Sequence, residues 1–566
     1  MIDWFELVGD SFWIGGISLL LIQLSYALLR RAETGIALRA LLLQPGFRLA
    51  GSLALLSVCI GLAANSRRGL WEGGFWLALA ALFAAEAWRS DRQRRGLPTQ
   101  VRPLLRQWLQ GQAPAALALI VLGVLLAALY AATVRPWMQP DEPRHFHVAL
   151  HVARLRQPVV WYNDRVPAWE REIIAEMEAH DFWWYGYSLI GWDPEHLPTS
   201  FNQIWGVAYG LAFFQQPLYY TFAGLWLQTW AADVSLSQAV VYLRFFNVLL
   251  LAFSLFGVYK IAKLLFPARP QLTLAILAFA ALWPSHLAAN AGVNNDALVE
   301  LTVIWALFFA VRLVRDGPRL ANVVWLLAFG LLSFYTKRSG LNAFVLFPLA
   351  LLLWGSGRWA GRWTRRRLLI GGGLAGAALV SALALALIAL RSQRLLLPAG
   401  FAADVWSGQY WQEVSSAPLG LFASALLRTF IGWFGWLRTP LPTPFYWAGG
   451  ALLLAAACGF LFELRRPRRA ALAGWQKRVL WLLVAALAIQ IGFVVGKEIV
   501  YASWRDGSLP QARYLYPVLP ALAIPLLMGW GRLAPARWHS LSLLIIGLLI
   551  FNIYVLAFIL YPFFWL

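Results

Sequence analysis

Two adjacent carboxylates, Asp141 and Glu142, stand a few residues after an apolar segment that is long enough to cross a membrane. A place at the water–lipid boundary and a like-charged neighbour would both raise a carboxyl pKa toward neutrality. That suits a general base that deprotonates an acceptor hydroxyl. The alternative is a helix start, with Asp141 as the N-cap and Pro143 in the first turn. Together with His145, the pair could instead hold a divalent metal such as Mn²⁺ or Mg²⁺, although the spacing is not a recognised metal motif.

Cations at the ends of later apolar segments are of the type that holds a phosphate. Lys337 and Arg338 occupy a short turn between two such segments, and Arg513 stands at the start of another. Arg244 lies inside a further apolar segment. Arginine and lysine in these places suit phosphate recognition. Side chains that reach up to lipid headgroups are the alternative.

Further polar residues interrupt the apolar segments and are candidates to line a substrate site. Asp296 follows two asparagines, and Glu300 lies one turn further into the apolar run. An acid inside a membrane span is costly, so a function is the default hypothesis for Glu300, whereas Asp296 also suits a helix cap. Gln216 and Tyr219 belong to a segment, 204–230, that we interpret as a re-entrant or juxtamembrane hairpin.

The composition defines the elements that must position these residues. The chain has 566 residues, of which 60% are hydrophobic and 13% are charged. A soluble protein is less apolar and about twice as charged, so a soluble enzyme, a disordered chain and a fibrous protein are excluded. We predict an all-α polytopic membrane protein with about fourteen spans. They cover roughly 12–29, 49–64, 71–88, 114–133, 238–258, 271–289, 294–311, 320–336, 341–355, 369–390, 446–462, 479–496, 514–530 and 541–562.

The distribution of charge predicts the orientation of these spans. The net charge is +21, and most lysines and arginines fall in alternate loops, as the positive-inside rule requires of cytoplasmic loops. Since each basic cluster flanks a span, membrane insertion explains it and a nucleic-acid partner is not expected. Two long segments, 134–203 and 391–445, then face outward, and the first is expected to bear juxtamembrane helices. We divide the chain into an N-terminal membrane module with a basic linker, 1–110, and a core, 111–566.

The ordered set of motifs resembles the GT-C superfamily of membrane glycosyltransferases, in the bacterial branch near protein mannosyltransferases and aminoarabinose transferases. Asp141-Glu142 is similar to the acidic motif of the first outer loop in that family. The motifs that follow, in the same order, are Gln216-Pro217-Leu218-Tyr219-Tyr220, Arg244, Asn295-Asp296-Ala297-Leu298, Thr336-Lys337 and Gln511-Ala512-Arg513-Tyr514-Leu515. The resemblance covers about 114–566, and the first three spans have no counterpart in it.

The resemblance implies a mechanism. A sugar would move from a polyprenyl-phosphate-linked donor to an acceptor hydroxyl on the outer face of the inner or plasma membrane, with inversion. Asp141 would be the base, and Glu142 would assist it or orient the acceptor. The donor phosphate would meet the cations Lys337, Arg338, Arg513 and Arg244, and the substrates would be lined by His145, Gln216, Tyr219, Asp296 and Glu300.

Other functions stay open at this point. A transporter or flippase of lipid-linked saccharide would use the same cations, although no inverted repeat is visible. A scaffold with a structured outer loop is the other alternative. The acceptor could be a lipid, a glycan or a protein, and the identity of the sugar is not indicated. Membrane lipids are expected partners in every case, and a divalent metal is the one cofactor left open.

Overall fold

The computed structural model describes residues 4–34, 36–64, 70–95, 112–156, 166–185, 198, 200–205, 216–359, 412, 415–465, 472–500, 509–533 and 541–566. The chain divides into two compact units. One comprises residues 1–114 with 152–160, and the other comprises 115–151 with 161–566. Each is described by itself. Both are helical, which confirms the all-α polytopic architecture.

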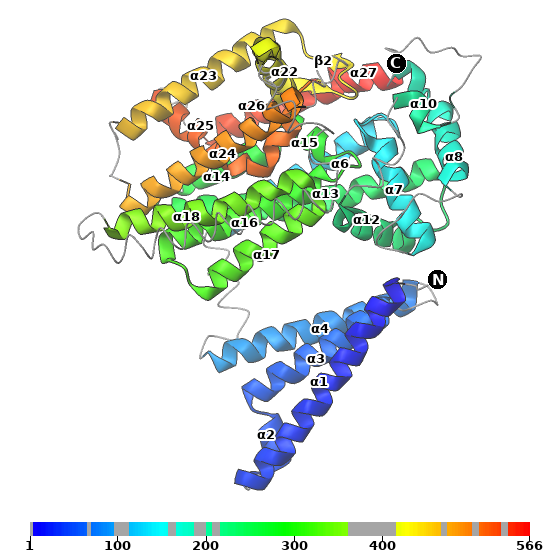
Figure 1. Ribbon diagram of the computed structural model, residues 1–566, viewed down its shortest axis with the longest axis vertical. Coiled ribbons are helices and arrows are strands. Elements are labelled where there is room, and N and C mark those ends of the chain that lie inside the picture. Colours follow the sequence, from blue (N-terminus) through cyan, green and yellow to red (C-terminus); the bar gives the residue numbers. More distant parts are fainter. Residues whose placement is uncertain are drawn as a thin grey trace. The chain divides into compact units, whose positions relative to one another are not determined.

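The first unit is built from α1 (Trp4–Thr34), α2 (Leu38–Leu42), α3 (Pro45–Ala64) and α4 (Leu70–Arg94). α3 packs against both α1 and α4 (Figure 1). Arg48 of α3 forms an ion pair with Glu86 of α4 and donates to Gln93 at 3.3 Å. Ser90 also donates to Glu86, at 3.2 Å. The acid within this apolar helix is therefore neutralised and hydrogen-bonded inside its own unit, as a membrane environment demands.

The second unit is organised around α16, which packs against α13, α17, α18 and the 3-10 helix η3 (Ala512–Val518). Of the most apolar stretch of α16, 83% is buried inside the protein, whereas only 22% of the corresponding stretch of the peripheral helix α23 is buried. The long helices of this unit are α6 (Ala113–Thr133), α13 (Leu236–Leu265), α16 (Asp296–Asp316), α17 (Leu320–Thr336), α18 (Asn342–Trp359), α22 (Leu419–Gly432), α23 (Thr443–Arg465), α24 (Gly474–Val500), α25 (Leu519–Leu533) and α26 (Leu541–Tyr554). The chain then continues through the π-helix η5 (Val555–Leu560) into α27 (Tyr561–Trp565).

Among the described residues, nine helices are long and apolar enough to span a membrane, or ten if one bent pair counts as a single span. That is fewer than the fourteen predicted. Two predicted spans, 12–29 and 320–336, fall on apolar stretches of fewer than eighteen residues: Phe12–Leu28, which is part of α1, and Leu320–Thr336, which is α17. The predicted span 71–88 falls on α4, which is not among the candidates, and the predicted span 369–390 lies outside the described residues.

The predicted span 271–289 is broken, not continuous. α14 (Pro270–Leu282) and α15 (Pro284–Asn290) meet at an angle of 55°. Pro284 has no N–H to donate to the carbonyl of Ala280, four residues earlier. Nδ1 of His286 takes over that bond at 2.8 Å, and Nδ2 of Asn552 donates to the carbonyl of Leu282 at 2.8 Å. Side chains thus satisfy the carbonyls that the break exposes.

The predicted outer segments contain shorter elements. The first holds α7 (Glu142–Leu155), α8 (Val166–Ala179), α9 (Phe182–Tyr185) and α10 (Phe201–Trp205), and α12 (Pro217–Trp230) follows it. In the second, strands β1 (Trp433–Phe434) and β2 (Thr439–Pro440) form an antiparallel hairpin. At its turn, Gly435 and Leu437 both have a φ of 59°. Part of this second segment, 391–411, lies outside the described residues.

Candidate active site

The turn between α6 and α7 sends the two adjacent carboxylates to different partners. Asp141 has a φ of 63°, in the left-handed region that aspartate adopts more readily than most residues. α7 begins at Glu142, as the helix-start alternative predicted. The side chain of Asp141, however, forms an ion pair with Arg513 of η3 (Ala512–Val518). Glu142 instead pairs with Arg244 of α13. Although they are adjacent in the sequence, the two carboxylates have different ion-pair partners.

Glu142 and Arg244 form a completely buried ion pair. Nε of Arg244 donates to Oε1 of Glu142 at 2.8 Å, and Nη2 donates to Oε2 at 2.6 Å. Arg244 also donates to the carbonyls of Ala131 (2.7 Å), Val134 (2.5 Å) and Arg135 (2.8 Å), at the end of α6. A guanidinium has five N–H donors, and all five are used. In this arrangement, Arg244 has no donor left for the phosphate that the sequence assigned to it.

The carboxylate of Glu142 is equally engaged. Besides the two bonds from Arg244, it accepts backbone N–H groups from Val293 at 3.1 Å and Gln139 at 3.4 Å. A carboxylate so surrounded ties the start of α7 to α13 and to the loop before α16. The structure thus favours a positioning role for Glu142 over direct contact with an acceptor.

Arg513 lies between two carboxylates that are far apart in the sequence. Its Nη2 forms the ion pair with Asp141, and its Nε lies 3.8 Å from Oδ2 of Asp296, the first residue of α16. Nζ of Lys337, just after α17, forms an ion pair with the other oxygen of Asp296. We call these four residues (Asp141, Arg513, Asp296 and Lys337) the charged cluster. The sequence predicted all four as site residues, and the structure brings them together.

The turn that presents Lys337 depends on a close backbone approach. Lys337 ends α17, and the 3-10 helix η1 (Arg338–Leu341) folds back over it. The amide of Gly340 donates to the carbonyl of Lys337 at 2.8 Å. A Cβ at position 340 would stand only 2.2 Å from the carbonyl oxygen of Ser333, so glycine is required here. Arg338 opens the same 3-10 helix, and its predicted contact with a phosphate stays a prediction.

The ring of Tyr514 collects three cations at the charged cluster. The side chains of Lys337, Arg513 and Lys497 lie 4.9, 5.0 and 5.3 Å from the centre of its ring. Its hydroxyl accepts from Nη2 of Arg513 at 3.0 Å. Cations stack favourably on an aromatic face. Three cations therefore share one aromatic platform and face three carboxylates, since Lys497 also pairs with Glu498 at 3.4 Å. An added anion would compete with these carboxylates for the cations.

The electrostatics of Asp141 differ from the sequence-based expectation. Burial by itself would raise the pKa of this carboxyl, but the adjacent charge of Arg513 outweighs burial and holds the pKa well below its usual range. The expected rise toward neutrality is therefore wrong. It assumed that Glu142 is the nearest charge, whereas Glu142 is neutralised by Arg244. Asp141 is ionised, and its charge is held by Arg513.

His145 lies one turn into α7 and is buried. Its Nδ1 lies 2.7 Å from the hydroxyl of Tyr220, and the two rings stack. Burial lowers the pKa of His145 to about 3, although the charge of Asp141 acts in the opposite direction. The imidazole is therefore neutral near pH 7. Glu142 is paired with Arg244, so the three candidate metal ligands, Asp141, Glu142 and His145, do not point toward one common site. No group of three or more metal-binding side chains is found in the described part of the chain.

Glu300 belongs to a second buried network, centred on the broken helix. Its Oε1 lies 2.8 Å from Nε2 of His286, and its Oε2 accepts from Nδ2 of Asn290 at 3.1 Å. His286 is the residue whose other nitrogen satisfies the carbonyl that Pro284 frees. Glu300 thus fixes α15 against α16. Its predicted substrate contact stays a prediction.

The remaining predicted residues lie around α12. The hydroxyl of Tyr219 donates to Asn247 at 3.1 Å, and Asn247 donates to the carbonyls of Gly292 (2.5 Å) and Asn294 (3.1 Å). Tyr219 thereby supports the loop that leads into Asp296. Gln216 is buried at the start of α12, and its role stays a prediction.

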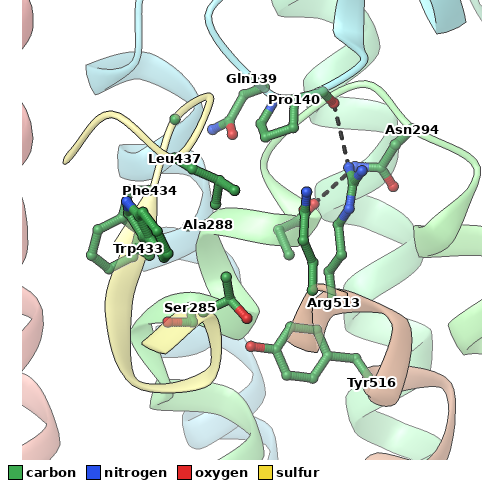
Figure 2. A pocket seen from close by; sticks show the side chains of 14 residues that line it. Gln139, Pro140, Ser285, Ala288, Asn294, Trp433, Phe434, Leu437, Arg513 and Tyr516 are labelled. Atoms are coloured by element: carbon green, nitrogen blue, oxygen red, sulfur yellow. Dashed lines mark hydrogen bonds between the residues drawn. The ribbon is translucent and has the colours of Figure 1, made fainter. Parts of the chain in front are cut away.

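A cavity of about 50 Å³ adjoins the charged cluster and shares Arg513 with it. Figure 2 shows its walls. They come from the turn before α7, from α15, from the hairpin of β1 and β2, and from η3. Sequence analysis did not identify three residues of this lining, Ser285, Tyr516 and Trp433. Each lies in or beside an apolar run, where a hydroxyl or an indole is typical of a buried core residue. The signal available was Pro284, whose break turns Ser285 toward the site.

Fold and site together define a polytopic, all-α membrane protein with a charged cluster where several helix ends meet. More narrowly, residues 122–522 match the family described as predicted membrane protein (DUF2142), and the chain belongs to that family. The match spans all four members of the charged cluster. No curated protein matches the sequence.

Proposed function

We propose that the protein is a membrane glycosyltransferase that moves a sugar from a polyprenyl-phosphate-linked donor to an acceptor hydroxyl on the outer face of the cell membrane. The observation that carries the proposal is the charged cluster. It offers an ionised carboxylate, Asp141, and this carboxylate is paired with Arg513, a cation that would bind a lipid phosphate. The motif order that resembles GT-C enzymes supports the same assignment.

The proposed reaction begins with an exchange of partners at Arg513. An incoming donor phosphate competes with Asp141 for Arg513 and is shared with Lys337 and Lys497 around Tyr514. Loss of the Arg513 contact raises the proton affinity of Asp141, which makes it a better base. A low pKa in the unliganded state is thus compatible with general-base catalysis.

In the chemical step, the acceptor oxygen forms a bond to the anomeric carbon as its proton passes to Asp141. The bond between that carbon and the phosphate oxygen breaks, and the electron pair leaves with the polyprenyl phosphate. Arg513 and Lys337 stabilise the charge of this leaving group. Attack from the face opposite the phosphate inverts the configuration. Asp296 keeps the two cations in place.

The test uses purified protein in liposomes, polyprenyl-phosphate sugars labelled in the head group, and candidate lipid and glycan acceptors. Asp141→Asn should reduce release of the lipid phosphate by about 10²-fold or more, the scale of general-base catalysis. Asparagine tolerates the left-handed backbone, so the turn is kept. Asp181→Asn is the matched control, since Asp181 is an exposed acid that pairs with Arg135 at 2.7 Å. Transfer by Asp141→Asn at the wild-type rate would remove Asp141 from the mechanism.

A transporter of lipid-linked saccharide is the second candidate, because transporters often build their sites at broken helices such as α14–α15. Here the freed carbonyls are occupied by His286 and Asn552, not left for a substrate. The same liposomes separate the two functions. A transporter would move the labelled lipid between leaflets without releasing its phosphate, and Asp141→Asn would leave that movement largely intact.

A further inference from the structure

We infer that the cavity beside Arg513 is a subsite for the hydroxyl groups of the donor's sugar. This inference rests on the proposed function, since it names the part of that donor which the cavity accepts. Four polar atoms on residues of the cavity wall lack their full set of hydrogen bonds. They are the hydroxyls of Ser285 and Tyr516, which have no partner outside this pair, Nε1 of Trp433, and Nε of Arg513, which makes only the 3.8 Å contact with Asp296.

These atoms are buried. Ser285 is 7% exposed and Tyr516 is 3% exposed. Figure 2 shows the side chains of Ser285 and Tyr516 directed toward each other in the wall of the cavity. Burying a polar group without a partner is costly, so natural sites keep such groups where water or a ligand completes them. Several around one cavity indicate that its normal content is polar. A prenyl chain would leave them all unsatisfied, and it is therefore excluded as the occupant.

The size of the cavity fits hydroxyl groups. One buried water needs about 10–15 Å³ of such space, so about 50 Å³ corresponds to roughly three to five water-sized groups. A set of hydroxyls along one edge of a sugar ring has this scale and chemistry. Ser285 and Tyr516 can each donate and accept, whereas Trp433 and Arg513 only donate. Hydroxyl groups, which also do both, can satisfy all four.

The position of the cavity indicates that it binds the sugar of the donor and not the acceptor. The sugar is bonded directly to the phosphate, and Arg513 belongs both to the charged cluster and to the cavity wall. A phosphate on the cluster side of Arg513 would place the attached sugar on the cavity side. The aromatic rings of Trp433 and Phe434 also line this side and offer apolar faces to the C–H groups of a sugar. The acceptor hydroxyl must instead approach Asp141, which is not part of the lining.

The experiment compares binding of two probes to full-length protein in detergent: a polyprenyl phosphate, and the same polyprenyl phosphate carrying a hexose. Wild type should bind the sugar-bearing probe more tightly. The double variant Ser285→Ala/Tyr516→Phe removes two hydroxyls without enlarging any side chain. It should lose about tenfold in affinity for the sugar-bearing probe, the scale of two modest hydrogen bonds, and bind the bare lipid phosphate as wild type does.

The matched control is Ser254→Ala/Tyr259→Phe in α13. It also removes two buried hydroxyls, which make no hydrogen bond, but neither residue lines the cavity. An equal loss in this control, or an unchanged preference in the Ser285→Ala/Tyr516→Phe variant, would overturn the inference. So would a wild type that does not distinguish the probes. If sugar transfer is still observed in those cases, the proposed function is kept and only the subsite is rejected. If neither probe binds and no transfer occurs, both the subsite and the proposed function are contradicted.

Discussion

At the residue scale, the role of each charged side chain follows from its partner and not from its neighbour in sequence. Asp141 and Glu142 are adjacent, yet one faces Arg513 and the other is fully enclosed by Arg244. The sequence identified both as candidates because residue type and location are visible in it. It could not assign their partners, because the direction of each side chain depends on the left-handed backbone at Asp141 and on helices far along the chain.

A pH-dependent stability is expected from His145. Burial lowers its folded-state pKa to about 3 from an ordinary value near 6.5, so between these values only the unfolded chain takes up this proton. Stability therefore falls as the pH drops below about 6.5, by up to about 1.4 kcal/mol per pH unit. Thermal unfolding in detergent, followed from about pH 7 down to about pH 5, should show this loss in wild type. His145→Gln should show a smaller slope, and an identical slope in both proteins would contradict the assignment.

At the scale of elements, the broken helix α14–α15 is the feature that most affects the site. Its second half, α15, supplies Ser285 to the cavity and His286 to the network of Glu300. An apolar window and a proline predict a helix in this region. They do not reveal a bend of 55°, because the bend is stabilised by side chains from α16 and α26. Sequence analysis therefore finds this element and misses its shape.

Glu300 should accordingly act as a positioning residue for α15. Glu300→Ala leaves His286 and Asn290 without their buried partner and should lower the free energy of unfolding by about 1–3 kcal/mol. Glu300→Gln keeps a polar group of the same shape beside Nε2 of His286 and Nδ2 of Asn290, so it should retain most of the stability. Thermal unfolding of the three proteins decides this. Equal melting temperatures for Glu300→Ala and wild type would show that the network does not stabilise α15.

At the scale of the whole molecule, composition and charge pattern were sufficient to predict the polytopic helical class. The ordered motifs include all four residues of the charged cluster, but also Glu142 and Arg244, which pair with each other instead. The motifs were not sufficient for the cavity, whose wall combines hydroxyls and aromatic rings that apolar segments also use in their cores. The number of spans could not be fixed from hydropathy either: α17 packs against α16 with one face and has only 17 residues, at the lower limit of what a span requires.

The sidedness of the charged cluster is a prediction for the intact chain. In a background of Cys59→Ala and Cys458→Ala, single cysteines would replace Trp184 of α9 and Leu320 of α17, which are 77% and 79% exposed. The positive-inside rule places the first outside and the second at the cytoplasmic surface. A membrane-impermeant maleimide should label Trp184→Cys in right-side-out vesicles and Leu320→Cys only after permeabilisation. The reverse pattern would place the charged cluster in the cytoplasm and contradict a donor on the outer face.

The saturated guanidinium of Arg244 has a consequence for biogenesis. A charged arginine inside an apolar helix is costly to leave in lipid. Every group that neutralises or accepts from it lies earlier in the chain, at the end of α6, in the following turn and at the start of α7. When α13 emerges from the ribosome, its counter-charge has already been synthesised. Lateral release of α13 into the bilayer can therefore be coupled to docking on α6, so that Arg244 is not exposed to lipid without its counter-charge.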